Sequence, residues 1–307
     1  MGSPSVRALR RLRHGEWVFP VEETLALVPG ADVAELRREL RRLGPGPTVA
    51  LGIGREPWPV GGEAPGGTPL AGHPGAGHPG ARPALEGLLG VAQETGRELA
   101  PRLLIAVRGE GCLRDLDLLR ALDRHTHLRI GVELGTLDAE LSARLEPGST
   151  APERRLEVLR ELSRAGLCAG VLLMPIYPEL TESPRALRRV VCQARMAGAR
   201  WLSARVLDLP GQARGDFFAW LVRERPDLLR SYGRMYRGWD PLPPEPVLDR
   251  IRRVVIALRS AYDLPAWVPL PPAPCPQREL FAPPAAPPEV AHPPGRPSGR
   301  VAAEPAA

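Results

Sequence analysis

Hydrophobic and polar residues follow two alternating patterns along the chain. Short, almost continuous apolar runs occur at about 48–53, 103–108, 127–134, 168–176 and 201–209. Such runs are typical of strands that are buried on both faces of a sheet. The segments between them carry apolar residues three or four positions apart, which indicates amphipathic helices. The repeated strand–helix order predicts a parallel α/β fold.

The segment 127–183 shows this order in most detail, because it holds a short and a longer helix between two strands. Thr136 or Asp138 is the expected N-cap of the short helix, since either side chain can accept a backbone N–H. Gly166 is expected to end the longer helix, because glycine adopts the left-handed C-cap conformation without steric cost.

Helices are also expected around the other strands. Each of these segments has one apolar stripe at helical spacing, which would pack against the sheet. The segments are 33–43, 84–100, 114–125, 184–199, 216–224 and 245–263.

Three segments lie outside this pattern. Residues 1–16 are polar and arginine-rich, residues 59–83 contain the repeat AGHPGAGHPG, and residues 264–307 are rich in proline. We expect a flexible N-terminus, a low-complexity loop and a disordered tail, because these segments bury too little apolar surface to offset the entropy lost on ordering. The folded domain is then expected to span residues 17–263.

The formal net charge is +6, and all 41 basic residues are arginine. A codon bias toward arginine in a GC-rich genome explains the missing lysine. Arginine also binds phosphates and stacks on bases, so a regulatory nucleic-acid-binding protein is one alternative function. Aromatic residues make up only 5% of the chain, which leaves few platforms for base stacking.

The cysteines and histidines do not predict a metal site. No two cysteines lie within five residues of each other, so the spacing of a metal knuckle is missing. His73 and His78 are five apart, but they lie in the low-complexity loop without a third ligand nearby. Cys168 and Cys192 stand in apolar patterns and are expected to be inert core residues. The four cysteines are Cys112, Cys168, Cys192 and Cys275.

No apolar run reaches the roughly 18 residues that a membrane span needs, and no secretory signal is visible. We therefore expect a reduced, cytoplasmic protein that does not associate with a membrane.

The segment 127–183 resembles the radical S-adenosylmethionine (SAM) superfamily in its spore photoproduct lyase-like branch, and the resemblance extends over roughly residues 20–235. It implies a partial (βα) TIM-like barrel whose first strand and cluster loop are absent or degenerate here. It also implies SAM and a [4Fe–4S] cluster as the cofactors of the family. The matching pieces are Thr136-Leu137-Asp138, Glu146-Pro147-Gly148, Pro152-Glu153-Arg154-Arg155-Leu156, Ala165-Gly166 and Pro175-Ile176-Tyr177-Pro178-Glu179-Leu180-Thr181.

The family holds its cluster through a C-x-x-x-C-x-x-C loop, which this sequence lacks. Cys112 follows a strand and could face the barrel mouth, but one thiolate does not hold a cluster. Cys168 begins a strand and should lie at the opposite end. The resemblance therefore implies a degenerate homologue without its own cluster.

An alternative is that the true start lies upstream. The missing loop would then restore an iron–sulfur enzyme that cleaves SAM. The sequence leaves open whether the chain is an enzyme, and it names neither a substrate nor a partner beyond a small molecule at the barrel mouth.

In (βα) barrels the functional residues lie at the C-terminal ends of the strands. Glu56 and Trp58 stand where the family usually has Thr-Asp-Pro-Tyr-Gln-Pro, and Arg108 stands where it has the lysine of Thr-Lys-Ser. Glu133 lies near the end of the predicted strand 127–134, on which the family carries serines. The resemblance makes these four residues the candidate SAM pocket.

Each candidate also has a structural interpretation. Glu56 and Trp58 could form a turn at the barrel mouth, and Arg108 and Glu133 could simply pair with each other. Arg154, which begins the helix after the Glu-Pro-Gly turn, could reach the site or form an anchoring ion pair.

Overall fold

In the computed structural model every described residue belongs to the first of two units, Met1–Ala273, and the second, Pro274–Ala307, lies outside the described residues. The fold below is that of the first unit. The described residues are 9–11, 24–27, 33–43, 48–52, 81–97, 100, 102–238 and 240–266.

Several residues discussed in the sequence analysis lie outside the described part of the chain. Glu56 and Trp58 are not described, nor are His73, His78 and Cys275. Most of the three segments 1–16, 59–83 and 264–307 also lies outside the described part of the chain. Their roles therefore stay predictions.

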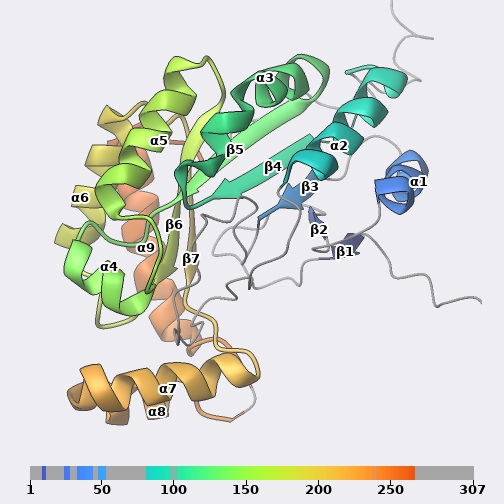
Figure 1. The fold of residues 1–307 in the computed structure, drawn as a ribbon. Helices are drawn as coiled ribbons and strands as arrows, with labels where there is room; N and C mark the ends of the chain where they lie inside the picture. Colours follow the sequence, from blue (N-terminus) through green and yellow to red (C-terminus); the bar gives the residue numbers. More distant parts are fainter. Residues whose placement is uncertain are drawn as a thin grey trace, which may run out of the picture. The chain divides into compact units, whose positions relative to one another are not determined.

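The strands form one sheet, and their order in the sheet follows their order in the chain. Six of the described strands run parallel, and β1 joins one edge antiparallel to β2. The sheet is curled into a half-barrel, as Figure 1 shows. The strands are β1 (Leu9–Arg11), β2 (Thr24–Leu27), β3 (Thr48–Leu51), β4 (Arg102–Val107), β5 (His127–Glu133), β6 (Ala169–Ile176) and β7 (Leu202–Val206).

The five predicted parallel strands are confirmed, and the predicted partial (βα) barrel with them. β2 is a further parallel strand, at the place where the first strand was expected to be absent or degenerate. It has four residues, Thr24–Leu27, as many as β3.

Most of the described helices lie between strands, the last three follow β7, and most of them pack on one face of the sheet (Figure 1). None of the described helices is both long and apolar enough to cross a bilayer. The helices are α1 (Val33–Leu43), α2 (Arg82–Thr95), α3 (Leu116–His125), α4 (Ala139–Leu145), α5 (Pro152–Arg164), α6 (Pro184–Met196), α7 (Gln212–Glu224), α8 (Leu229–Met235) and α9 (Glu245–Ala261), with 3-10 turns η1 (Glu110–Asp115) and η2 (Pro226–Leu228).

The ends of the central helices agree with the local sequence. Asp138 caps α4 by accepting the Leu141 N–H at 2.9 Å, and Thr136 Oγ1 accepts the N–H of Asp138 at 3.0 Å. Gly166, which follows the C-cap of α5, has φ of +83°, a conformation that favours glycine. The predicted caps are thus confirmed.

Side chains alternate between the two faces of β5. Leu128, Ile130 and Val132 belong to the main core beneath the helices. Arg129 and Glu133, the alternate residues, are buried as well and point to the concave face of the half-barrel. The concave face therefore carries charged groups where the helix-covered face is apolar.

Two glycines on the concave face leave room for one large side chain. Trp201 is fully buried beside β6. A Cβ atom on Gly131 would lie 2.5 Å from the Leu172 side chain and 2.8 Å from the Trp201 ring, and a Cβ on Gly170 would overlap the same ring. Gly131 and Gly170 are paired across β5 and β6, so they form a flat platform under the indole.

Arginines tie the ends of helices to neighbouring helices. Each of three side chains donates to main-chain carbonyls at the C-terminus of another helix, where such carbonyls lack intrahelical partners. The bonds run from Arg97 Nη1 to Asp123 O (2.9 Å) and Arg124 O (3.2 Å), from Arg120 Nε to Ala165 O (3.2 Å), and from Arg195 Nε to Tyr262 O (3.2 Å).

The glycine platform predicts that two glycine-to-alanine substitutions, one on the platform and one away from it, change the free energy of unfolding differently. Gly170→Ala should lower the free energy of unfolding by about 1–3 kcal/mol, because the new methyl group overpacks against Trp201. Gly215→Ala in α7 should leave stability unchanged or raise it by up to about 1 kcal/mol, because its nearest neighbour is 3.5 Å away and alanine favours a helix. Urea unfolding of both variants measures the difference. Equal effects would contradict the platform.

Candidate functional site

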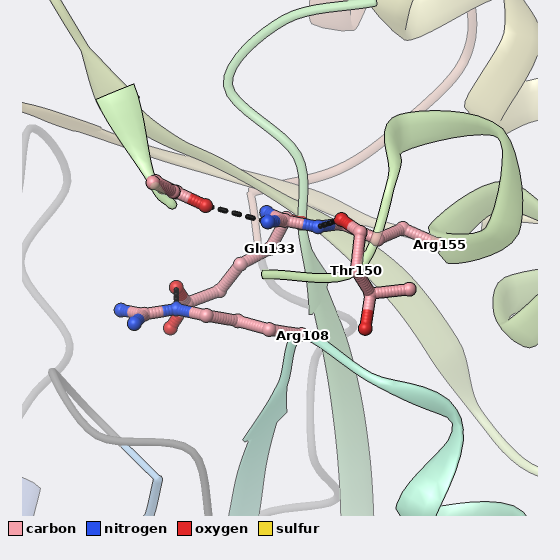
Figure 2. Close-up of polar contacts among 5 residues, drawn as sticks. Arg108, Glu133, Thr150 and Arg155 are labelled. Atoms are coloured by element: carbon pink, nitrogen blue, oxygen red, sulfur yellow. Dashed lines mark hydrogen bonds and ion pairs between the residues drawn. The ribbon is translucent and has the colours of Figure 1, made fainter. Parts of the chain in front are cut away.

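Two oppositely charged side chains meet at the carboxyl ends of β4 and β5. Arg108 follows the last residue of β4, and Glu133 is the last residue of β5. Arg108 Nε donates to Glu133 Oε2, and the two side chains are 9% and 1% exposed. The predicted pairing of Arg108 with Glu133 is confirmed, and Figure 2 shows the two residues together.

The Glu133 carboxylate has an oxygen that this pair does not use. Oε1 is buried and has no hydrogen-bond partner among the described residues. A buried carboxylate oxygen without a donor is unfavourable by about 1–3 kcal/mol or more. A bound molecule with an N–H or O–H donor would remove this penalty. The ion pair with Arg108 therefore explains only one of the two carboxylate oxygens of Glu133.

Arg155 holds the end of β5 from the other side. Its Nη1 donates to the main-chain carbonyl of Glu133 at 3.2 Å, and its Nε donates to Thr150 O at 2.8 Å. Its Nη2 pairs with Glu146 Oε2 at 2.5 Å. The side chain of Arg155 is only 3% exposed, so these contacts form a buried clamp on the strand end that carries Glu133.

The sequence interpretation named Arg154 and missed Arg155. Arg154 is exposed and pairs with Glu110 and Glu157 at 2.6 Å each, so the anchoring ion pair is the alternative that holds. Helical spacing could have identified the neighbouring Arg155 as a buried residue. Arg155 precedes the buried Leu159 by four residues and therefore lies on the inner stripe of α5.

A small pocket adjoins the clamp. Burial raises the pKa of the Tyr177 phenol well above its usual range, and the Glu146 charge adds to the shift, so the hydroxyl stays protonated. The pocket has a volume of about 10 Å³, room for about one water molecule, and is partly open to solvent. It is lined by Gly135, Thr136, Ser142, Leu145, Glu146, Arg155, Pro175 and Tyr177.

An aromatic cluster connects this pocket to α7 and α8. Phe217 of α7 stacks on Tyr177 with a ring-centroid distance of 5.9 Å, and it also contacts Trp220 and Tyr232. Tyr232 donates its hydroxyl hydrogen to Pro178 O at the end of β6. The wall of the pocket is thereby fixed by a second hydrophobic core.

The described cysteines do not fit an iron–sulfur cluster. Cys112 was considered for the barrel mouth, but it is fully buried in the main core, because η1 turns its side chain inward and its thiol donates to Gly109 O at 3.6 Å. Cys168 lies just before β6, at the opposite end, as expected, and is buried. Cys192 in α6 is only half-buried. Within the described ranges no three Cys, His, Asp or Glu residues gather as metal ligands.

Fold and site together define a partial (βα) barrel protein with a buried, charged site at the carboxyl ends of its strands. No family model matches the chain. The uncharacterized proteins Rv2578c and MT2655 of Mycobacterium tuberculosis and Mb2609c of Mycobacterium bovis are 30% identical to it over 261 residues, which is 80% of this chain and 70% of each relative. The chain belongs to the family of these mycobacterial proteins.

Solved structures that are similar to this chain in backbone fold come from two different proteins. A spore photoproduct lyase variant with bound AdoMet and dinucleoside spore photoproduct has a TM-score of 0.48 and 14% identity, covering 74% of this chain and 63% of its own. Streptococcus suis SuiB bound to S-adenosylmethionine has a TM-score of 0.40 and 12% identity, covering 67% of this chain and 41% of its own. This chain thus spans less than two thirds of either protein.

The clamp on β5 is tested by paired substitutions. Arg155→Met should lower the free energy of unfolding by about 3 kcal/mol, because it takes the guanidinium partner from the buried Glu146 carboxylate. Arg154→Met, one residue earlier on the exposed face, should change it by less than about 1 kcal/mol. Chemical denaturation of both variants gives the comparison, and a similar loss in both would rule out the clamp.

Proposed function

We propose that the chain is a radical SAM superfamily protein of the spore photoproduct lyase-like branch, and that it binds SAM at the carboxyl ends of β4 and β5. The motif residues between Thr136 and Thr181 support the superfamily. The observation that carries the binding site is the buried Glu133 Oε1, which has no hydrogen-bond partner among the described residues.

The two charged residues suit the amino-acid end of SAM, which carries an ammonium and a carboxylate. Glu133 Oε1 would accept a hydrogen from the ammonium, and the Arg108 guanidinium would attract the carboxylate. Arg155 would keep the Glu133 main chain in place through its bond to the carbonyl. When bound, SAM supplies an activated sulfonium group.

The same proposal treats the chain as a degenerate homologue without its own [4Fe–4S] cluster. It rests on the scattered positions of Cys112, Cys168 and Cys192. The alternative is an active iron–sulfur enzyme whose cysteine loop belongs to a longer protein. The matched region covers 70% of the length of the mycobacterial relatives. The activity of the whole protein is therefore a proposal, both for the degenerate homologue and for the active enzyme.

The proposed partner is a small molecule at the barrel mouth. Glu56 and Trp58 stay predicted contributors to its pocket, since they lie outside the described residues. Nucleic-acid binding stays a prediction from the net charge of +6, and a cytoplasmic location stays a prediction from the cysteine pattern.

Calorimetric titration tests the SAM site. SAM and S-adenosylhomocysteine should both bind, whereas methylthioadenosine, which lacks the amino-acid end, should not. Glu133→Gln should weaken SAM binding by roughly ten- to a hundredfold, because one charge-assisted hydrogen bond is lost. The control Glu157→Gln changes an exposed carboxylate on α5 and should leave the affinity unchanged. Binding of methylthioadenosine as tight as that of SAM would refute the proposed site.

Anaerobic reconstitution with iron and sulfide tests the cluster. The chain should gain no [4Fe–4S] cluster, because a cluster normally requires several cysteine ligands close together. Absorbance and iron analysis measure the outcome. A broad band near ~400 nm with about four irons per chain would contradict the degenerate assignment and support the iron–sulfur alternative.

A further inference from the structure

A second charged region lies at the amino-terminal edge of the sheet, opposite the SAM site. Arg129 is the third residue of β5 and faces the concave side. It is four residues before Glu133, which corresponds to about 13 Å along a strand. Trp201, seated on the glycine platform, lies between the levels of the two residues.

Arg129 is buried and forms no ion pair among the described residues. Its exposed fraction is 9%, and Nη1 donates to Leu128 O at 2.9 Å. Nε is buried and has no hydrogen-bond partner, and no described carboxylate forms an ion pair with the guanidinium. An unpaired charge in the interior is strongly unfavourable, so this position calls for an anion.

A second arginine lies across the neighbouring strand. Arg200 precedes β7, is exposed, and donates its main-chain N–H to Ala169 O at 2.9 Å. The N–H of Ile130 bonds to Cys168 O at 3.1 Å, so Cys168 lies between Arg129 and Arg200 at the start of three adjacent strands. One arginine is thus buried and the other open to solvent.

Groups of both signs surround Arg129. Burial lowers the pKa of the Arg129 guanidinium, the Cys168 thiol and Asp123 oppose this, and the charges of Arg200 and Arg97 lower it further. Arg97 is already bonded to the carbonyls that end α3. Arg129 and Arg200 both also lower the pKa of the Cys168 thiol, against the larger rise from its burial, so these two guanidinium groups lie near the same thiol.

We propose that Arg129 and Arg200 bind the phosphate group of a small molecule beside Cys168. A phosphate has the charge to balance two arginines, and its oxygens match the fork of N–H groups on a guanidinium. The site is separate from Arg108 and Glu133, so it stands or falls independently of SAM binding.

Thermal unfolding in phosphate and in chloride at equal ionic strength tests the site. In chloride, Arg129→Met should be at least as stable as the native chain, because it removes an uncompensated buried charge. In phosphate, the native chain should gain roughly 3–5 °C more than Arg129→Met. Phosphate also stabilises proteins through exclusion from their surface, and this part should be equal in both.

Two further variants complete the test. Arg189→Met removes an exposed arginine of α6 and should keep the full phosphate gain. Arg200→Met, also at an exposed position, should lose much of it and is the variant to use if Arg129→Met does not fold. If Arg200→Met and Arg129→Met gain as much from phosphate as the native chain, the proposal is overturned.

Phosphorus NMR identifies the kind of ligand. Inorganic phosphate and adenosine monophosphate should each give broader ³¹P lines with the native chain than with Arg200→Met. Equal broadening would show that the site recognises the phosphate group alone. Stronger broadening of adenosine monophosphate would add a contact to the nucleoside. If neither line differs between the two proteins, there is no phosphate site.

Discussion

Burial of opposite charges at one edge of a parallel sheet is the constraint on which the candidate site depends. Arg108, Glu133, Arg155 and Glu146 are all at least nine-tenths buried and form two ion pairs. Buried pairs add little net stability compared with apolar residues of the same size, because their desolvation offsets their attraction. Their geometry instead fixes where a carboxylate lies. The end of β5 is held by side chains of β4 and α5, so Glu133 is presented in one orientation.

The inner face of β5 combines two incomplete groups with opposite charge. Glu133 at one end has an acceptor without a donor, and Arg129 at the other has a donor without an acceptor. Trp201 fills the level between them above Gly131. A barrel interior is normally filled by side chains, and here Trp201 lies between the two ends. Under the two proposals above, the two groups would bind different ligands, one with a cationic donor and one anionic.

Most of the fold could be predicted from the sequence, because apolar runs and helical stripes are local patterns. The ends of α4 and α5 followed from Asp138 and Gly166 for the same reason. The pairing of Arg108 with Glu133 was among the alternatives, since parallel strands bring their ends together. Arg155 was missed because a charged residue on a buried stripe is read as an exception, and because its three acceptors, on Glu133, Glu146 and Thr150, all lie outside α5. Cys112 was misplaced because the 3-10 turn after β4 has no clear sequence signal.

The platform under Trp201 links three positions that lie far apart in the chain. A Cβ on Gly170 would meet the indole, whereas a Cβ on Gly131 would meet the Leu172 side chain before the indole. A smaller residue at position 201 would therefore free room at position 170. Among relatives, a side chain at 170 should accompany a small residue at 201, and a side chain at 131 should also require a smaller residue at 172. Such paired changes would place a pocket in the middle of the half-barrel, so the same scaffold could accept ligands deeper between its strands.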